Sequence, residues 1–492
     1  MGEDGGQTFT VDDALLAMGF GKFQILVLVY AGMGWVSEAM EMMLLSFIGP
    51  AVQSLWGLSS HQESLITSVV FVGMLIGAYS WGVVSDKHGR RRGFLITAIV
   101  TAVAGFLSAF APNYILLIIF RCFVGLGLGG GHVLASWFLE FIPAPNRGTW
   151  MVIFSAFWTV GTIFEASLAW FVMPKLGWRW LLALSSLPSL LLLLFYGVTP
   201  ESPRYLCLKG RRIDALNVLE KIARINGAKL PSGVLVSEHE VELEGRSILA
   251  EDTHLLSTGN KEDETHNERA AGGFSSLLML LSPELIKSTL LLWVVFFGNA
   301  FSYYGLVLLT TELNNGRNSC HTNALQSEKS QDVSYRDVFI TTFAEFPGLL
   351  LAAATVDKLG RKVSMSSMFF LCCIFLLPLV FHESRGLTTG LLFGARICIT
   401  STFTVVYIYA PEIYPTSVRS TGVGVASSMG RIGGMICPLV AVGLIHGCHQ
   451  TAAIILFEIV IFVSGICVLL FPLETTGREL TDSISISKET SN

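Results

Sequence analysis

Two glutamates, Glu38 and Glu41, stand one helical turn apart inside the apolar stretch "GWVSEAMEMMLLSFIGP" at residues 34–50. A charged side chain inside a membrane is costly, so it is retained where it faces water, a partner charge or a solute. A glutamate in a medium of low dielectric can take up and release a proton, whereas an arginine keeps its charge. The two acids therefore point to protonation chemistry or to the binding of a cationic group.

Four further charges, Arg121, Glu165, Glu345 and Arg396, each lie in an apolar run of their own. With a helical rise of about 1.5 Å per residue, Glu38, Arg121 and Glu165 fall about 9–10 Å below the outer edge of a hydrocarbon core about 30 Å thick. The other two charges fall about 12 Å below that edge. Five charges at one depth are expected to face a wet cavity or one another.

We predict that Glu38 is the proton-coupling acid and that Arg121 is its partner. Protonation of Glu38 would release Arg121, which would then meet a substrate carboxylate or permit closure of the protein. A static ion pair that fixes helix packing is the alternative. Glu41 lies about 4.5 Å nearer the outside. It is a candidate contact for a cationic substrate group, and an acid that reaches the outer vestibule is the alternative there.

Aromatic and amide side chains are expected to complete the site. Aromatic rings stack on a planar ring or cover a quaternary ammonium by cation–π attraction, although ordinary helix packing is the alternative for each of them. In "FFGNAFSYYG", a polar residue and two tyrosines stand between glycines, which suits a bending helix with polar groups facing the bundle interior. The candidate substrate-binding residues are Glu41, Glu165, Asn299, Tyr303, Tyr304, Glu345, Arg396, Trp35 and Trp158.

The composition is that of a polytopic helical membrane protein. The 492-residue chain is 52% apolar and 14% charged, whereas soluble domains carry about a quarter charged residues. Its apolar runs are near the length of about 20 residues that crosses a bilayer. We predict an all-α membrane protein with twelve transmembrane helices, at roughly 24–48, 63–84, 94–111, 114–138, 149–172, 178–197, 288–311, 337–356, 364–382, 388–410, 420–445 and 451–471.

The predicted spans form two sets of six around a long polar segment. Residues 1–197 are the N-terminal six-helix half, 198–287 a cytoplasmic loop that is partly disordered, 288–471 the C-terminal six-helix half and 472–492 a cytoplasmic tail. Short loops on one side carry nine Lys and Arg against six on the other, and the long loop adds eleven to the first side. The excess of positive charge places both termini in the cytoplasm.

An internal repeat relates the two halves. "DKHGRR" begins at Asp86 and "DKLGRK" at Asp357, while "EFIPAPNRGT" from Glu140 matches "EIYPTSVRST" from Glu412. Markers that recur in the same order indicate two pseudo-symmetric halves. The acids and arginines are expected to link helix ends in a gate that opens as the halves move, and a simple topology anchor is the alternative. The predicted gate residues are Asp86, Gly89, Arg90, Arg91, Glu140, Arg147, Asp357, Gly360, Arg361, Glu412 and Arg419.

These paired loops, together with "RCFVGLGLGG", "PESPRYL", "PEIYPTSVRSTG" and "PLETTGREL", resemble the sugar-porter-like branch of the major facilitator superfamily over nearly the whole chain. The opening "TVDDALLAMGFGKFQ" is similar to the synaptic vesicle 2-related group, which includes plant organic cation/carnitine and nicotinate transporters. The resemblance implies alternating access to a central site. It also implies that an acid of the first helix faces the arginine of the fourth, as in proton-coupled sugar porters, which here assigns the roles to Glu38 and Arg121.

We therefore predict a secondary active transporter, proton-coupled, for small charged organic metabolites of the organic cation and carnitine class or the nicotinate and N-methylnicotinate class. The alternatives are a non-transporting receptor or vesicle protein on the same fold, or a porter of sugar or another solute. No enzyme activity, metal or cofactor is predicted. With a net charge of -5 and no dense basic tract, the sequence argues against nucleic acid as a partner.

The expected partners are the solute, a proton and the lipid bilayer, and the chain is expected to be a monomer. The plasma membrane is favoured and an internal, vacuolar membrane is the alternative. Cys320 and Cys448 fall in loops on the outer side, and whether they form a disulfide is left open by the sequence.

Overall fold

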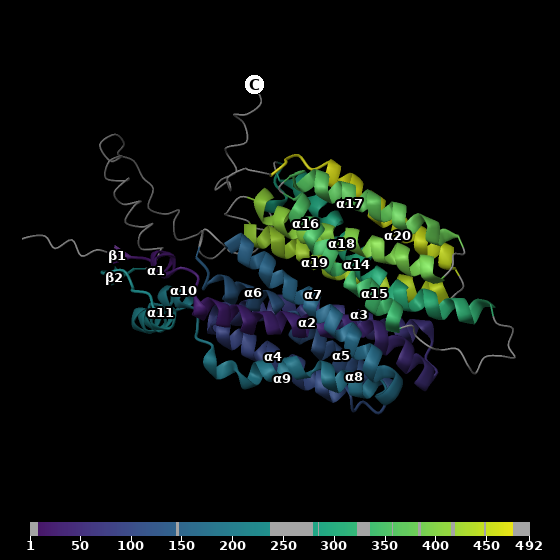
Figure 1. Ribbon diagram of the computed structural model, residues 1–492, viewed down its shortest axis with the longest axis horizontal. Helices are drawn as coiled ribbons and strands as arrows, with labels where there is room; N and C mark the ends of the chain where they lie inside the picture. The colour runs from purple at the N-terminus through teal and green to yellow at the C-terminus, as the bar shows by residue number, and fades with distance from the viewer. Residues whose placement is uncertain are drawn as a thin grey trace, which may run out of the picture.

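The computed structural model is almost entirely helical and describes residues 8–143, 147–236, 279–283, 285–321, 335–356, 358–381, 385–414, 419–446 and 449–475. Two bundles lie side by side, one purple to blue and the other green to yellow (Figure 1). The first, the N-terminal half, contains α2 (Lys22–Trp56), α3 (Ser60–His88), α4 (Arg90–Ser108), α5 (Tyr114–Leu128), α6 (Gly131–Leu139), α7 (Arg147–Leu176), α8 (Trp178–Ser185) and α9 (Leu187–Leu194).

The second bundle, the C-terminal half, repeats this plan. It contains α14 (Ile286–His321), α15 (Tyr335–Phe343), α16 (Glu345–Thr355), α17 (Arg361–Leu376) with the short 3₁₀ turn η3 (Leu377–Val380), α18 (Arg385–Ile413), α19 (Arg419–His446) and α20 (Gln450–Leu469). Among the described residues, eleven helical segments are long and apolar enough to cross a membrane, and the shorter apolar segment Trp178–Leu194 stands where the sixth span is predicted. The predicted arrangement of twelve spans is confirmed.

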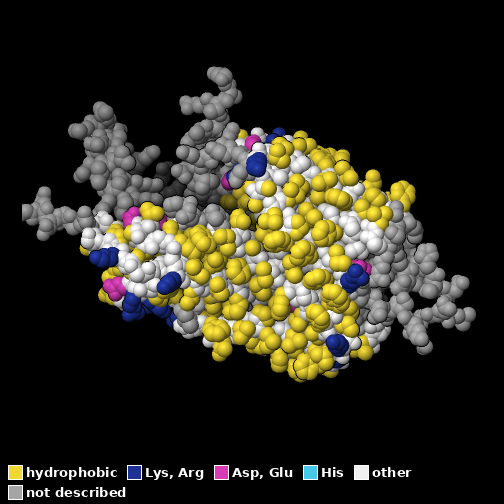
Figure 2. Space-filling view, viewed as in Figure 1, with side chains coloured by type: hydrophobic (Ala, Val, Ile, Leu, Met, Phe, Trp, Pro, Cys, Tyr) yellow, Lys and Arg dark blue, Asp and Glu magenta, His cyan; other side chains and the backbone are white. Residues whose placement is uncertain are grey.

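A broad band of hydrophobic side chains covers the face of the molecule in Figure 2, and charged side chains gather at the two ends of the bundle. Exposed apolar residues such as Val29, Phe123 and Phe171 lie on long helices. A soluble protein rarely exposes so large a contiguous apolar surface. The band is therefore the lipid-facing surface of a multi-pass membrane protein.

Small residues bring α3 and α5 together at backbone distance. Gly73 and Gly77 on α3 face Gly125 on α5 and Gly129, the residue that follows the last residue of α5. A Cβ added at Gly125 would lie 2.0 Å from the carbonyl oxygen of Val70. This close crossing is the small-residue packing typical of membrane helices, where van der Waals contact is the main attraction.

One end of the bundle carries a small cap. It contains β1 (Thr8–Phe9), α1 (Val11–Met18), the 3₁₀ turn η2 (Tyr196–Val198), α10 (Pro203–Leu208), α11 (Arg212–Asn226) and β2 (Val234–Leu235). The two strands pair in parallel. Helix α11 is amphipathic, and its apolar face, including Leu219 and Ile222, is buried against the N-terminal half. The side chain of Asn226 ties the cap to α2, since its Oδ1 accepts a hydrogen bond from the Phe23 backbone N–H at 2.9 Å.

The close crossing of α3 and α5 can be tested by its effect on thermal stability. Gly125→Ala should lower the apparent melting temperature of the purified protein, because the new methyl group must push apart two backbones and such overpacking costs roughly 1–3 kcal/mol. Gly443→Ala on α19 is the matched control, since a Cβ there meets nothing within 4 Å and alanine favours the helix. Equal melting temperatures for the two variants would contradict the packing described here.

Candidate functional site

Arg121 of α5 pairs with Glu41 of α2, not with Glu38. The Arg121 Nη1 lies 2.9 Å from Glu41 Oε2, and both side chains are fully buried. The Arg121 Nε also donates to Ser108 Oγ at 3.2 Å. The predicted Glu38–Arg121 pair is therefore wrong: Glu38 leaves α2 in a different direction and makes no ion pair or hydrogen bond with the residues that the structure describes.

Glu165 of α7 belongs to the same buried cluster in the N-terminal half. Both of its carboxylate oxygens lie 2.9 Å from Ser185 Oγ on α8. Arg121 and Glu41 both act on it electrostatically. Two acids thus share one arginine in a region without exposure, and the structure brings Glu165 to this cluster within one half.

Glu345 of α16 lies at a contact between the two halves. Its Oε1 accepts hydrogen bonds from Arg396 Nη2 of α18 at 2.7 Å and from Tyr303 OH of α14 at 2.6 Å. Its Oε2 accepts one from Thr162 Oγ1 of α7 at 2.8 Å. The first two donors come from the C-terminal half and the third from the N-terminal half. Thr162 sits one turn from Trp158, whose indole donates to Tyr303 OH at 3.0 Å.

The predicted aromatic residues come together between the halves. Trp35 and Trp158 lie 5.6 Å apart between ring centroids, and Tyr303 and Tyr304 lie 5.2 Å apart in an edge-to-face arrangement. Phe71 of α3, which the sequence analysis did not select, packs on Tyr304 at 4.8 Å. These rings form a continuous aromatic group across both halves, with Glu345 at its edge.

Asn299 lies one turn before Tyr303 on α14 and is only 1% exposed. Its Oδ1 accepts a hydrogen bond from Thr402 Oγ1 at 2.9 Å, but its Nδ2 has no partner. The Nε and Nη1 of Arg396 and the Nη2 of Arg121 are also unpaired. Buried polar atoms are nearly always satisfied by protein, water or ligand, so these donors leave bonding capacity beside the buried ion pairs.

Arg431 of α19 is a charge that the sequence analysis missed. It is half-buried and acts electrostatically on Glu38 of α2 and on Tyr304 of α14. Among the described residues it makes no ion pair or hydrogen bond. The signal that would have found it is the one used for the other charges, a single ionised residue inside a predicted span.

The repeated turns have the same construction in both halves. Gly89 and Gly360 adopt positive φ values of 107° and 86°, which favour glycine. Arg90 then bonds to Glu140 at 3.3 Å, and Arg361 makes two bonds to Glu412 at 3.2 Å. These ion pairs link helix ends within each half, and their role in a gate stays a prediction.

Two further acids, Glu201 and Glu474, were missed as members of this network. Glu201 accepts from the Arg91 backbone N–H at 3.0 Å, and Glu474 accepts from Arg361 N–H at 2.8 Å. Each carboxylate thus caps the first turn of a helix, α4 or α17, where the helix dipole favours negative charge. The signal was available, because "PESPRYL" and "PLETTGREL" follow the last span of each half.

Some predicted gate residues, and the two loop cysteines Cys320 and Cys448, lie outside what the structure describes. Asp357 and Cys448 fall outside the described residues, and the side chains of Asp86, Arg147, Arg419 and Cys320 are likewise not described. The Glu140 carboxyl can be described: burial raises its pKa above the ordinary value, and the charge and hydrogen bond of Arg90 act against that rise.

The fold and the site define a class, a membrane transporter built from two related six-helix halves with buried charges and aromatic rings at their contact. Residues 27–484 match the family model described as "Sugar (and other) transporter". The chain therefore belongs to this family, within the major facilitator superfamily.

The relatives agree with this assignment. The chain is 72% identical to "Organic cation/carnitine transporter 7" of Arabidopsis thaliana, over 99% of this chain and 98% of that protein. It is 39% identical to "Synaptic vesicle 2-related protein" of Xenopus laevis, over 97% of this chain and 83% of that protein. Its fold is similar to the inward open xylose transporter XylE from E. coli, with a TM-score of 0.66, 16% identity and coverage of 93% and 98% of the two chains.

The buried Arg121–Glu41 pair can be tested by an experiment that distinguishes Glu41 from Glu38 as the partner of Arg121. Arg121→Met should lower the melting temperature strongly, since removing one partner of a buried pair costs roughly 3–5 kcal/mol, and adding Glu41→Leu should recover most of the loss because neither charge is then left alone. Adding Glu38→Leu instead should recover nothing. Recovery by Glu38→Leu and not by Glu41→Leu, measured by thermal unfolding of the purified variants, would contradict the pairing.

Proposed function

We propose that this transporter moves a small zwitterion, with a carboxylate and a quaternary nitrogen on one compact skeleton, by alternating access. Carnitine and N-methylnicotinate are of this chemistry. The observation that carries the proposal is Arg431, which has no ion pair or hydrogen bond among the described residues. Both Arg431 and Glu345 act electrostatically on Tyr304 of the aromatic group. The 72% identical relative is named an organic cation/carnitine transporter, which agrees with the proposal.

The charges suit both ends of such a solute. A carboxylate is attracted to Arg431, whose guanidinium has five donors and no described partner to satisfy them. A quaternary nitrogen has no hydrogen to donate and is held by ring faces, which Trp158, Tyr303 and Tyr304 supply. Nicotinate, an anion with an aromatic ring, satisfies the first requirement and stacks on the same rings without using the charge of Glu345.

The contacts between the halves support an alternating mechanism. Trp170 packs on Phe339 with ring centroids 5.5 Å apart, and Phe47 packs on Tyr335 at 6.0 Å. These contacts lie toward the end of the bundle remote from the turns at Gly89 and Gly360. We propose that this remote end faces outward and is closed here, and that opening it breaks the bond from Thr162 to Glu345.

We further propose that an ion gradient drives transport, with the proton as the coupling ion that the sequence analysis favours. Surplus carboxyl groups in the N-terminal half, Glu38 and Glu165, support an ion-coupled step. We place both termini in the cytoplasm because the cap and both charged turns share one end of the bundle and the loops there carry the excess of Lys and Arg. We also propose that the chain works as a monomer in the plasma membrane.

Uptake of labelled solutes by cells lacking the activity tests the substrate. The wild-type chain should take up carnitine or N-methylnicotinate, and Arg431→Gln should raise the KM for that zwitterion about tenfold or more, because a charge-assisted hydrogen bond contributes roughly 1.5–3 kcal/mol. Uptake of a simple quaternary ammonium should change little in this variant.

Arg224→Gln on the exposed face of α11 is the matched control and should behave as wild type. The proposal fails if none of the zwitterions enters the cells, or if Arg431→Gln takes up the zwitterion with an unchanged KM. A selective loss of quaternary ammonium uptake in Arg431→Gln would also contradict it, since the arginine would then not be serving the carboxylate.

A further inference from the structure

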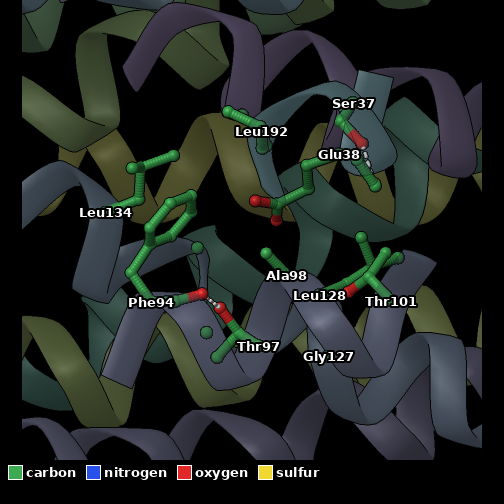
Figure 3. Close-up of a pocket in the computed structure, with 14 residues that line it drawn as sticks. Ser37, Glu38, Phe94, Thr97, Ala98, Thr101, Gly127, Leu128, Leu134 and Leu192 are labelled. Carbon is green, nitrogen blue, oxygen red and sulfur yellow. Dashed lines mark hydrogen bonds between the residues drawn. The ribbon is translucent and has the colours of Figure 1, made fainter. Parts of the chain in front are cut away.

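Two cavities of the N-terminal half differ in the charge of their walls. The smaller, of about 40 Å³, lies inside the bundle, where the Glu38 carboxylate lies against Gly131 and the rest of the lining is uncharged (Figure 3). The larger, of about 690 Å³, lies at the end of the bundle that carries the cap. Its size is within the range of about 300–1,000 Å³ that small-molecule sites occupy, and none of the candidate substrate-binding residues lines it.

The larger cavity, here called the basic pocket, lies between the turn that joins α3 to α4 and the cap. Its walls come from α3, α4, η2, α10 and α11. Tyr205 of α10 donates from its hydroxyl to the Lys87 carbonyl at 3.1 Å, and Glu201 accepts from the Arg91 backbone N–H at 3.0 Å. These two bonds fix the cap against the turn, so the pocket is a defined part of the fold.

The basic pocket has a surplus of three positive charges when His88 is neutral, because five Lys and Arg line it against two acids. Both acids are already engaged. Asp214 pairs with Arg211 at 2.8 Å, and Glu201 accepts hydrogen bonds from two backbone N–H groups. The guanidinium of Arg91 is held over a neighbouring tyrosine ring, 4.3 Å from its centroid. The remaining positive charge is therefore available to a ligand.

Three cations of the pocket have no partner charge. Lys87 and Arg92 are exposed on the side of the turn, and Lys209 extends from the cap, with its Nζ 5.6 Å from the centroid of the Tyr205 ring. The side chains of these three residues make no ion pair or hydrogen bond within the part of the chain that the structure describes. They approach one space from two sides, which is the arrangement that a compact polyanion requires.

The basic pocket adjoins the lipid-facing surface. Leu194 and Phe195, which are 74% and 49% exposed, directly precede Tyr196, a residue of the pocket wall. Lys and Arg side chains gather on the cap at this end of the molecule, beyond the hydrophobic band (Figure 2). The pocket thus lies where the apolar surface ends, at the level of the lipid headgroups.

We propose that the basic pocket binds a ligand with two or more phosphate groups, of the kind found in the headgroup of an inositol phospholipid. Guanidinium and ammonium groups form strong charge-assisted bonds to phosphate, and basic pockets at the cytoplasmic surface of membrane proteins bind such headgroups. A free inositol phosphate offers the same chemistry, and the adjoining lipid surface favours the lipid as its source. A ligand that bridges Lys87 or Arg92 to Lys209 ties the cap to the turn that holds the Arg90–Glu140 pair.

Thermal unfolding of the purified full-length protein in detergent tests the site with inositol trisphosphate, the soluble form of such a headgroup. A ligand that binds only the folded protein raises the melting temperature, so we expect a saturable rise with inositol trisphosphate and little change with citrate at the same ionic strength. The variant Lys87→Gln/Arg92→Gln/Lys209→Gln should weaken the apparent affinity about tenfold or more, because its charge-assisted bonds to phosphate are lost. These side chains are exposed, so the variant should match wild type when no ligand is present.

The variant Lys175→Gln/Arg224→Gln/Lys229→Gln is the matched control, since it removes three exposed cations outside the pocket, and it should keep the full response. The proposal is overturned if inositol trisphosphate gives wild type no rise, or if citrate gives an equal rise. It is also overturned if the pocket variant responds as strongly as the control.

Lipid nanodiscs identify the source of the phosphate groups. Discs with phosphatidylinositol bisphosphate should give wild type a higher melting temperature than discs of equal charge with phosphatidylserine, and the pocket variant should show no difference. Equal melting temperatures of wild type in both discs, together with binding of inositol trisphosphate, would overturn the lipid source and assign the site to a free phosphate compound. None of these measurements needs a transported solute, so their outcome is independent of the proposed substrate.

Discussion

The bond between Thr162 of α7 and Glu345 of α16 joins the two halves at a buried ion pair. Glu345 is held by Arg396 and Tyr303 of its own half, and its second oxygen is held by Thr162 of the other at 2.8 Å. A carboxylate in a membrane must have its charge and its lone pairs satisfied. Separating the halves would remove Thr162, one of the three donors to Glu345. The hydrogen bonding of this buried acid therefore depends on the relative position of the halves.

The aromatic group between the halves is linked to that contact. Trp158 reaches Tyr303 at 3.0 Å, so the aromatic group that forms between the halves is tied to Glu345 as well. The ring contact between the halves, Phe71 with Tyr304 at 4.8 Å, therefore depends on how the halves meet. At the turns, Arg90 with Glu140 and Arg361 with Glu412 act within their own halves. Each of these ion pairs joins helix ends within one half and none of them crosses between the halves.

The sequence predicted the fold well because its signals are local. Apolar runs indicate spans, and the repeated "DKHGRR" and "DKLGRK" turns indicate two halves. The twelve-span architecture could therefore be predicted, as could the placing of Arg90, Glu140, Arg361 and Glu412 at helix ends. The selected aromatic residues also lie close together, because a helix face with polar and aromatic residues inside a membrane packs toward the interior of the bundle.

The sequence could not choose between Glu38 and Glu41. Counting residues gives depth along the helix, and both acids are at suitable depths, but two residues three apart differ by about 60° around the axis. That rotation decides whether a carboxylate faces Arg121 or Gly131, and it depends on how α2 packs against its neighbouring helices. The break at Gly130 was hidden for a similar reason, since a broken and a continuous span are equally apolar. Arg431 was visible in the sequence and was overlooked.

The distance between the outer ends of α7 and α15 tests the role of the Thr162–Glu345 bond most directly. Spin labels at the exposed positions Leu176 and Arg336 report this distance by double electron–electron resonance. We predict that the two spin labels lie at one short distance in the otherwise wild-type protein. In Thr162→Val a large part of the population should shift to a longer distance, because the hydrogen bond between the halves to Glu345 is lost. An unchanged distance distribution in Thr162→Val would contradict it.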